Sequence, residues 1–318
     1  MTAATPALAE PTAAANNKLR HVVESQQFTL PLLMELFQRT REMERVVARG
    51  GTLDYQNRIL ATLFYQPSTR TRFSFEAAMH RLGGRVLSSE HASTFSSEIE
   101  GEQVEDTIRI LGGYSDVIVI RHHEEGGARR AAQVSPVPVI NAGDGQGGQH
   151  PTQALLDLYT IYRERPLDGL SIAFVGELDR GRTARSLAYL LAKFERVKVF
   201  FVSPPELQMR SDILEYLDRH HVRYELESEI DRVVGQADLI YQTRIAPQRA
   251  PAAHRSRFAI TASMLSGMRT NAMILHPLPR TVEIDPAVDD DPRAMYFRQA
   301  RNGVFVRMAL LTMLLDKD

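Results

Sequence analysis

The sequence has 318 residues, yet it contains no cysteine, no long apolar run and almost no excess of charge of either sign. The absence of cysteine excludes disulfides, thiolate nucleophiles and cysteine-ligated metals. No apolar segment is long enough to span a bilayer, so we expect no membrane association. The formal net charge of −1 gives no electrostatic reason to bind nucleic acid. What is present is 43% hydrophobic residues, enough for the cores of two domains.

The first 17 residues, MTAATPALAEPTAAANN, are rich in alanine, threonine and proline. They lack the apolar core of a secretory signal, and they lack the arginines and serines that are typical of a transit peptide. We therefore expect residues 1–17 to form a disordered tail, and we expect the protein to be cytoplasmic.

Strand-like and helix-like segments alternate along the rest of the chain, which predicts an α/β fold with mainly parallel sheets flanked by helices. The apolar runs that predict strands occupy 59–65, 84–89, 116–121, 137–142, 170–176, 197–204, 237–243 and 272–279. A glycine-rich stretch opens a long helix near residue 150, and we place a domain boundary there. We expect a first domain over 18–150 and a second over 151–294, joined by long helices. The apolar C-terminal helix, within 295–318, is expected to return to the first domain.

The stretch YQPSTRTRF (65–73) places three hydroxyls and two arginines at the start of a predicted helix. Pro67 ends the preceding strand, and Ser68 is a suitable N-cap. The first backbone N–H groups of a helix have no partner within it, and the helix dipole is positive at this end. Because Thr69, Arg70 and Thr71 add further donors, this turn predicts a phosphate-binding site.

Other donors follow later predicted strands, at the ends where parallel sheets bind their ligands. They are Arg121, His150 with Gln153, Arg182, Arg244, and the segment HPLPR at 276–280. The same set offers no nucleophile, because the chain has no cysteine and no GxSxG elbow. Such a set is typical of an enzyme that binds anions and stabilises a developing oxyanion. We therefore expect substrates that carry phosphate and carboxylates.

Three common kinds of site do not fit this sequence. GELDRGRT (176–183) has the spacing of a P-loop, but Arg182 stands at the position of its lysine. The GxGxxG fingerprint of nicotinamide enzymes is absent after the same strand. His122 and His123 are adjacent on a strand and would point in opposite directions, and no other metal-ligand spacing occurs. We therefore expect no metal ion.

Several motifs together resemble the catalytic chain of aspartate carbamoyltransferase, within the aspartate/ornithine carbamoyltransferase superfamily. They are FYQPSTRTRFSFE, GYSDVIVIRH, INAGDG followed by QHPTQALLDLYTI, GRTARSLAYLLAKF, YQTR and LHPLPR. The likeness runs from about residue 18 to the C-terminus. Ornithine carbamoyltransferases share the STRTR box and HPTQ but typically carry an HCLP-type motif, so HPLPR favours the aspartate enzymes.

The resemblance implies transfer of a carbamoyl group from carbamoyl phosphate to the amine of L-aspartate, as in de novo pyrimidine synthesis. It implies that Arg182 and Arg244 bind the aspartate carboxylates, and that no metal or organic cofactor is used. It also implies a homotrimer with active sites shared between subunits, alone or within a larger complex. The residues implied to bind carbamoyl phosphate are Ser68, Thr69, Arg70, Thr71, Arg121, His150, Gln153, Leu278 and Pro279, of which Arg70, Thr71, Arg121 and His150 are the catalytic candidates.

Two departures from the family pattern leave the amine acceptor open. The loop that the family supplies from a neighbouring subunit carries a serine and then a lysine, and here Ser96 and Ser97 are followed by Glu100 at the lysine position. A repulsive contact between unit charges about 4 Å apart costs roughly 4 kcal/mol at an effective dielectric near 20. The family glutamine of the TRxQ motif is replaced by Ala246. The alternatives are a carbamoyltransferase with another acceptor, and a paralogue that binds carbamoyl phosphate with impaired catalysis.

Overall fold

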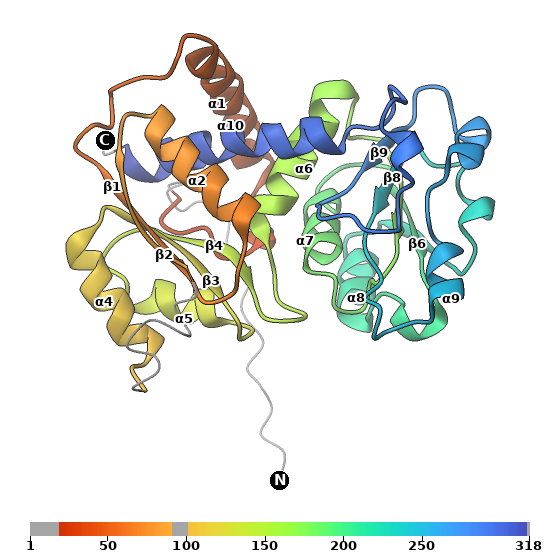
Figure 1. The fold of residues 1–318 in the computed structure, drawn as a ribbon, viewed down its shortest axis with the longest axis horizontal. Coiled ribbons are helices and arrows are strands. Elements are labelled where there is room, and N and C mark those ends of the chain that lie inside the picture. The colour runs from red at the N-terminus through yellow and green to blue at the C-terminus, as the bar shows by residue number, and fades with distance from the viewer. Residues whose placement is uncertain (1–18, 91–100, 317–318) are drawn as a thin grey trace.

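Two parallel sheets form the two halves of the molecule in the computed structural model, which describes residues 19–90 and 101–316 (Figure 1). The first sheet has the order β2-β1-β3-β4 and the second has the order β7-β6-β5-β8-β9. Every neighbouring pair is parallel, which confirms the predicted α/β class. The strands are β1 (Ile59–Phe64), β2 (Arg85–Glu90), β3 (Val117–His122), β4 (Val139–Asp144), β5 (Ser171–Val175), β6 (Lys198–Val202), β7 (Arg223–Glu227), β8 (Leu239–Gln242) and β9 (Met273–Leu275).

Helices cover both faces of the first sheet, because alternate residues of its buried strands point to opposite sides. Leu60 and Phe64 of β1 pack in one hydrophobic cluster with residues of α1 (Leu30–Ala48), α2 (Thr69–Arg81) and α10 (Tyr296–Leu315). Ala61 and Leu63 pack in another cluster, against α4 (Val104–Tyr114) and α5 (Gly127–Val134). The strands β1, β3 and β4 are therefore buried on both sides, as their apolar sequences predict, whereas the edge strand β2 is partly exposed.

The second sheet is layered in the same way. One face packs against α7 (Arg182–Leu191) and α8 (Ser211–Arg219), and the other against segments on either side of the short α9 (Ala252–Ser256). Phe174 and Tyr241 face α7, whereas Val175 and Ile240 face the opposite layer. Both layers therefore hold the carboxyl ends of the strands in fixed positions.

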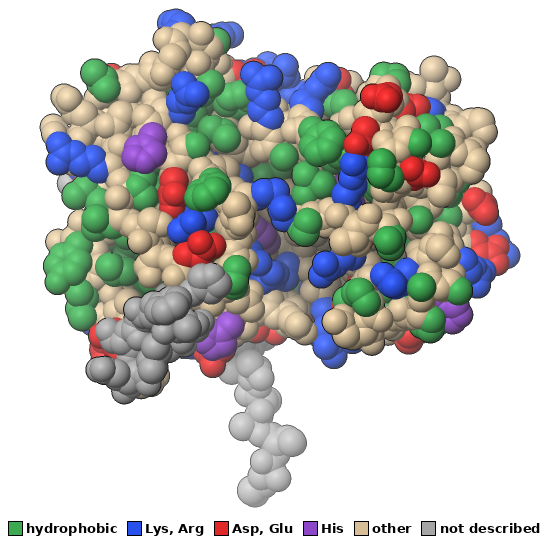
Figure 2. Space-filling view, viewed as in Figure 1, with side chains coloured by type: hydrophobic (Ala, Val, Ile, Leu, Met, Phe, Trp, Pro, Cys, Tyr) green, Lys and Arg blue, Asp and Glu red, His purple; other side chains and the backbone are tan. Residues whose placement is uncertain are grey.

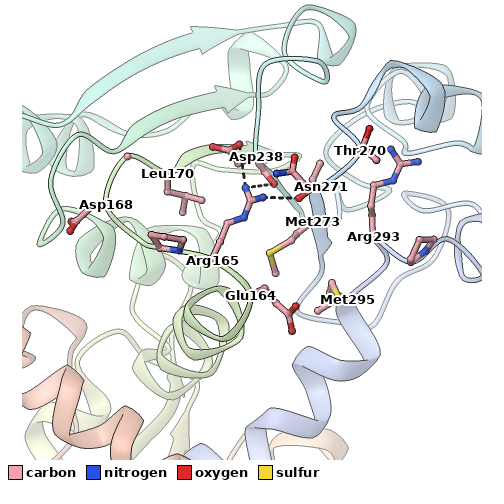
Figure 3. A pocket seen from close by; sticks show the side chains of 14 residues that line it. Glu164, Arg165, Asp168, Leu170, Asp238, Thr270, Asn271, Met273, Arg293 and Met295 are labelled. Carbon is pink, nitrogen blue, oxygen red and sulfur yellow. Dashed lines mark hydrogen bonds and ion pairs between the residues drawn. The ribbon is translucent and has the colours of Figure 1, made fainter.

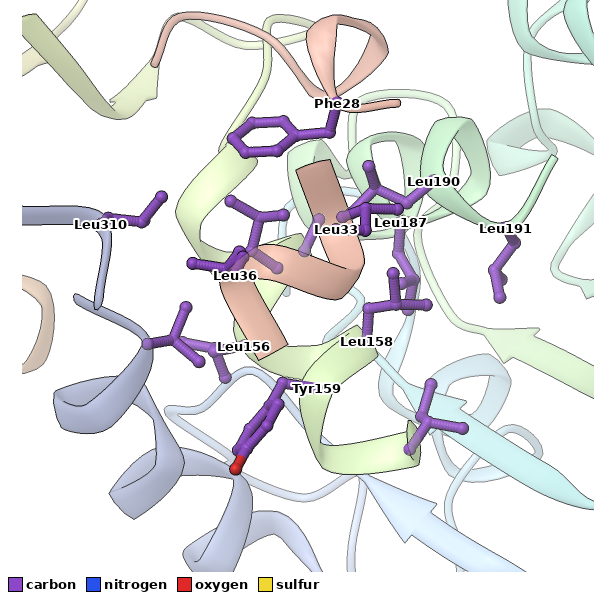
Figure 4. Packing of buried hydrophobic residues seen from close by; sticks show 14 of the residues in the cluster. Phe28, Leu33, Leu36, Leu156, Leu158, Tyr159, Leu187, Leu190, Leu191 and Leu310 are labelled. Atoms are coloured by element: carbon purple, nitrogen blue, oxygen red, sulfur yellow. The ribbon is translucent and has the colours of Figure 1, made fainter. Parts of the chain in front are cut away.

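The helix α6 (Pro151–Glu164) joins the two halves and is buried along most of its length. Figure 4 shows its residues Leu156, Leu158 and Tyr159 with side chains of α1, α7 and α10 around them. One hydrophobic cluster passes through α6 from the first sheet to the second. A helix that is apolar on most sides is expected in such a place, and each fully buried leucine stabilises the fold by about 1.5–3 kcal/mol.

The C-terminal helix returns to the first half, as predicted, but it is longer than the sequence pattern indicated. It begins at Tyr296, runs across the molecule in Figure 1 and packs against α1, α2 and α6. The sequence pattern missed α1, α5 and β7. The strand β7 lies at the sheet edge and reads RYELE, so it carries little of the apolar signal by which buried strands are found.

None of the helices in the described part of the chain combines the length and the apolarity that crossing a membrane requires.

Candidate active site

A cleft of about 830 Å³ lies between the two halves, where residues that follow β1, β3, β4, β5, β8 and β9 come together. Its lining includes Arg70, Arg121, Arg182, Arg244 and Arg307, and the described lining contains no aspartate or glutamate. Figure 2 shows basic side chains (Lys or Arg, blue) and a histidine (purple) in the hollow at the centre of the molecule. A partly enclosed site with only positive formal charges favours ligands with several negative charges.

The cleft brings together every predicted site residue that the structure describes. These residues are Ser68, Thr69, Arg70, Thr71, Arg121, His150, Gln153, Arg182, Arg244, Leu278 and Pro279. The predicted loop residues Ser96, Ser97 and Glu100 lie outside the described residues. Ala246 is not part of the described lining, and its backbone N–H donates to the Glu177 carboxylate at 3.2 Å.

The N-terminus of α2 forms one end of the cleft. The helix begins at Thr69 with Ser68 as the N-cap residue, and the Ser68 side chain makes no capping hydrogen bond. Its hydroxyl is therefore not consumed by the helix. The two arginines of the STRTR box differ: Arg70 lines the cleft, whereas Arg72 turns away and forms an ion pair with Glu90 at 2.9 Å. Only Arg70 is placed to bind an anion there.

Arg121, at the end of β3, lies deeper in the cleft. Its Nη1 donates to the carbonyl oxygen of Ala142 at 3.0 Å, and its Nε has no hydrogen-bond partner among the described residues. Burial, together with the charges of Arg182 and Arg70, lowers the pKa of Arg121 to about 9, so the side chain is still a cation at neutral pH. The guanidinium has donors left for a ligand.

Gly143 makes room for this arrangement. It has φ +109, and a Cβ atom there would lie 2.9 Å from Arg121 Nη1 and 3.3 Å from His150 Cδ2. The backbone at the end of β4 therefore approaches both side chains more closely than any residue with a side chain allows.

His150 is buried at the N-cap position of α6. Its backbone N–H donates to Ser186 Oγ of α7 at 2.9 Å, which ties the start of α6 to the second half. Burial first, and then the charges of Arg121, Arg182 and Arg307, hold the pKa of His150 well below its usual value. The imidazole is therefore neutral at pH 7 and can donate one N–H to an oxygen in the cleft.

We expect His150 not to titrate between pH 6 and 8, where an ordinary histidine gains its charge. Protein labelled with ¹⁵N-histidine should show ring nitrogen shifts for His150 that stay those of a neutral imidazole over this range. A His150→Gln variant assigns the signal. A His150 midpoint near 6.5 would contradict the effect of burial and of the three arginines.

The structure adds Arg307 to the cleft, which the sequence reasoning missed. It is 3% exposed, and its Cζ lies 4.9 Å from the centre of the Phe75 ring. Burial lowers the pKa of Arg307 to about 10. The sequence feature that could have indicated Arg307 is its position as the single charged residue in the apolar run VFVRMALLTMLL.

A second cavity, of about 620 Å³, lies at the amino ends of β5, β8 and β9 (Figure 3). Its cations are already paired: Arg165 contacts Asp238 and the carbonyl oxygen of Asn271, and Arg293 contacts Asp291. Glu164 and Asp168 also line it. The cavity therefore lacks the free positive charge of the interdomain cleft, in which we place the candidate active site.

Family models match nearly the whole chain. Residues 20–163 match the aspartate/ornithine carbamoyltransferase, carbamoyl-P binding domain, and residues 168–314 match the aspartate/ornithine carbamoyltransferase, Asp/Orn binding domain. The two matched regions meet at the end of α6.

Named relatives and solved structures agree with these matches. The chain is 51% identical to the chloroplastic aspartate carbamoyltransferase of Oryza sativa subsp. japonica, over 95% of this chain and 86% of that one. It is 47% identical to the aspartate carbamoyltransferase catalytic subunit of Methanothrix thermoacetophila, over 94% of this chain and 99% of that one. It superposes with a TM-score of 0.88 on aspartate transcarbamoylase from Trypanosoma cruzi in complex with N-(phosphonacetyl)-L-aspartic acid, at 39% identity over 94% and 97% of the two chains. The chain therefore belongs to the aspartate carbamoyltransferases of the aspartate/ornithine carbamoyltransferase family.

Proposed function

We propose that this chain transfers the carbamoyl group of carbamoyl phosphate to the amine of L-aspartate, giving N-carbamoyl-L-aspartate and phosphate. The observation that carries the proposal is the interdomain cleft, whose described lining has five arginines and no acid. Carbamoyl phosphate and aspartate are both anions, and such a cleft can hold them side by side. Relatives named aspartate carbamoyltransferase support aspartate over a different acceptor, despite Glu100 and Ala246.

The phosphate would bind at the N-terminus of α2. Ser68, Thr69 and Thr71 supply hydroxyls there, Arg70 supplies a charged fork, and the first turn of the helix supplies backbone N–H groups. These donors also stabilise the charge on phosphate as it leaves. Phosphate is therefore held as substrate and released as product at one end of the cleft.

The carbamoyl carbonyl would point towards Arg121 and His150. The amine nitrogen of aspartate attacks the carbonyl carbon, the oxygen becomes negative, and the bond from the carbon to the bridging phosphate oxygen then breaks. A buried cation and a neutral imidazole N–H both favour that oxyanion. The nitrogen that attacks loses a proton to solvent or to the departing phosphate.

The carboxylates of aspartate would bind Arg182 and Arg244, which lie in the half of the molecule that follows α6. Arg182 is largely buried, and this burial lowers its pKa because it removes water from the charged guanidinium. A carboxylate that pairs with Arg182 would compensate for that loss of hydration. Arg244 is exposed at the mouth of the cleft. One arginine for each carboxylate matches a dicarboxylic amino acid.

A ureido-group assay with carbamoyl phosphate and a panel of amines tests this function. We expect product with L-aspartate at a higher kcat/KM than with glutamate, asparagine, ornithine or lysine. Preference for ornithine or lysine would instead support an acceptor that pairs with Glu100. Absence of product with every amine would indicate a paralogue with impaired catalysis.

We further infer that the chain forms a homotrimer with shared sites, and that the loop carrying Ser96, Ser97 and Glu100 reaches a neighbouring subunit. Exposed apolar side chains on the first half support an interface there. Leu87 is 46% exposed on the edge strand β2, and Ile110 and Tyr114 are 47% and 61% exposed on α4. Figure 2 shows hydrophobic side chains at this edge, on the left of the view. The cytoplasmic location stays a prediction, since the plant relatives are named chloroplastic.

Mixing two inactive variants should restore activity if the sites are shared. In a random mixture of Arg70→Ala with a Ser96→Ala/Ser97→Ala double variant, about one quarter of the sites would combine two intact halves. We expect activity to rise towards that fraction of wild type after dissociation and reassembly. A protein that sediments as a monomer with full activity would contradict the shared site.

A further inference from the structure

The cleft has a side lobe between α2 and α10, which none of the steps described under the proposed function uses. The two helices lie side by side, and α10 also packs against α6 (Figure 1). The walls of the lobe are mainly apolar and consist of Phe73, Ser74 and Ala77 of α2, Leu156 of α6, and Ala300 and Val304 of α10. Neither carbamoyl phosphate nor aspartate would need these side chains, so the lobe is open to another ligand.

Arg307 lies at the inner end of this lobe. Ala300, Val304 and Arg307 are spaced i, i+4 and i+7 on one face of α10, and along this face the side chains change from exposed to half-buried to 3% exposed. None of the Arg307 nitrogens donates a hydrogen bond to another residue in the described part of the chain. The guanidinium lines the cleft, so its N–H donors are available to a ligand there.

The charge of Asp157 acts on Arg307 but does not pair with it. Burial lowers the pKa of Arg307, and Asp157 acts in the opposite sense. The Asp157 carboxylate accepts hydrogen bonds from other groups. Gln153 Nε2 and Gln299 Nε2 donate to Oδ1 at 2.8 and 2.6 Å, and the Tyr241 hydroxyl donates to Oδ2 at 2.6 Å. Arg307 is therefore a buried cation without an ion-pair partner among the described residues.

The fold accepts two unfavourable features to keep this guanidinium in place. A buried cation without a partner loses its hydration and gains no attraction in return. Gly303, inside α10, destabilises a helix relative to alanine, and a Cβ atom there would lie 2.5 Å from Arg307 Nη1 and 3.1 Å from Leu156 Cδ2. An apolar residue at position 307 would remove the need for both. An anionic ligand, rather than stability, therefore explains the arginine.

The donors and walls of the lobe restrict the kind of anion. The Ser74 hydroxyl already donates to the carbonyl oxygen of Thr71 at 2.9 Å, so Arg307 supplies the free side-chain donors of the lobe. One guanidinium pairs with one carboxylate through two parallel hydrogen bonds. A phosphate would leave oxygen atoms without donors against apolar walls, and an amino acid would bring an ammonium group to a described lining without acids.

We propose that the side lobe is a second binding site, separate from the substrate positions, for a small monocarboxylate with a short apolar body. The carboxylate pairs with Arg307, and the apolar part lies against Leu156 and Val304. The four arginines assigned to carbamoyl phosphate and aspartate are not part of this lobe. The inference therefore goes beyond the proposed function and does not depend on it.

Ligand-detected NMR with isovalerate as the probe tests the proposal. Isovaleramide has the same apolar body without the charge, and acetate has the charge without most of the body. We expect the full-length wild type to bind isovalerate at least about tenfold more tightly than either, the effect of one charge-assisted pair or of a few buried methyl and methylene groups. No binding of isovalerate, or equal affinity for isovalerate and isovaleramide, would overturn the proposal.

Two substitutions in the wall of the lobe test Arg307 without removing it. Residues 304 and 307 are neighbours on the helix surface, so the new carboxylate of Val304→Glu can pair with Arg307 in place of the ligand. Val304→Gln adds a side chain of the same size without the charge. We expect Val304→Glu to bind isovalerate at least about tenfold more weakly than Val304→Gln does. Equal affinities of the two variants would contradict a carboxylate site at Arg307.

Substitutions of the arginines themselves show where the probe binds. Arg307→Met should remove the preference for isovalerate over isovaleramide, whereas Arg70→Ala and Arg244→Ala should leave the affinity for isovalerate within about threefold of wild type. An unchanged preference in Arg307→Met, or loss of binding in Arg70→Ala or Arg244→Ala, would place the probe at the substrate positions and overturn the proposal. None of these measurements depends on turnover. Failure to carbamoylate aspartate would overturn the proposed function and leave them unchanged.

Discussion

Replacing Arg121 with alanine is expected to lower kcat for carbamoyl transfer by about 10²–10³-fold, the usual effect of removing a donor that stabilises an oxyanion. The side chain is held by Ala142 O and keeps an Nε that has no partner among the described residues. It also lies in a cleft whose described lining contains no acid, where water cannot easily replace a cation. Steady-state rates at saturating concentrations of both substrates would measure the effect, with circular dichroism as the check on folding.

Arg121→Lys is the matched control for this prediction. Lysine keeps the positive charge but lacks the planar guanidinium fork. The kcat of Arg121→Lys should therefore exceed that of Arg121→Ala by less than about tenfold. If the kcat of Arg121→Ala were within about threefold of the wild-type value, other groups than Arg121 would stabilise the carbonyl oxygen.

Replacing Arg70 with alanine is expected to weaken binding of carbamoyl phosphate by about 100-fold. A charge-assisted pair to phosphate is worth roughly 2–4 kcal/mol once its partner is left unpaired. Arg70 lines the cleft beside the start of α2, where its guanidinium is exposed and available to an incoming anion. Calorimetry with carbamoyl phosphate, or with phosphonoacetamide to avoid hydrolysis, would measure the affinity.

Arg72 provides the control within the same box. Its guanidinium contacts Glu90 at 2.9 Å and Ser88 at 3.3 Å, on the other side of the helix from the cleft. Arg72→Ala should therefore change the affinity by less than about threefold. Equal losses in the two variants would mean that the anion lies between both arginines rather than beside Arg70.

The contrast between these arginines shows what the sequence could and could not predict. The strand–turn–helix pattern around 59–81 was sufficient to predict a helix N-terminus with several hydrogen-bond donors, because caps, dipoles and donors are local properties. Two residues along a helix are turned by roughly 200° from each other, so Arg70 and Arg72 cannot face the same ligand. The choice between them depends on Ser88 and Glu90 of β2, which the sequence does not place.

The hydrogen-bond network behind the cleft was out of reach for the same reason. Asp157 meets Tyr241 and Gln299, which are 84 and 142 residues away along the chain. In the sequence, Asp157 is one polar residue in a long helix. Gln299 is one of several polar residues that precede an apolar run. Only the packing of α6 against β8 and α10 brings these side chains together.

A crystal structure of this chain with N-(phosphonacetyl)-L-aspartate would show whether the interdomain cleft, whose described lining has five arginines and no acid, holds both substrates. The analogue joins a phosphonate to the two carboxylates of aspartate. We expect its phosphonate at the N-terminus of α2 beside Arg70, its carbonyl oxygen near Arg121 and His150, and its carboxylates on Arg182 and Arg244. Binding in the cavity beside Arg165, or in the cleft with the carboxylates turned away from Arg182 and Arg244, would contradict it.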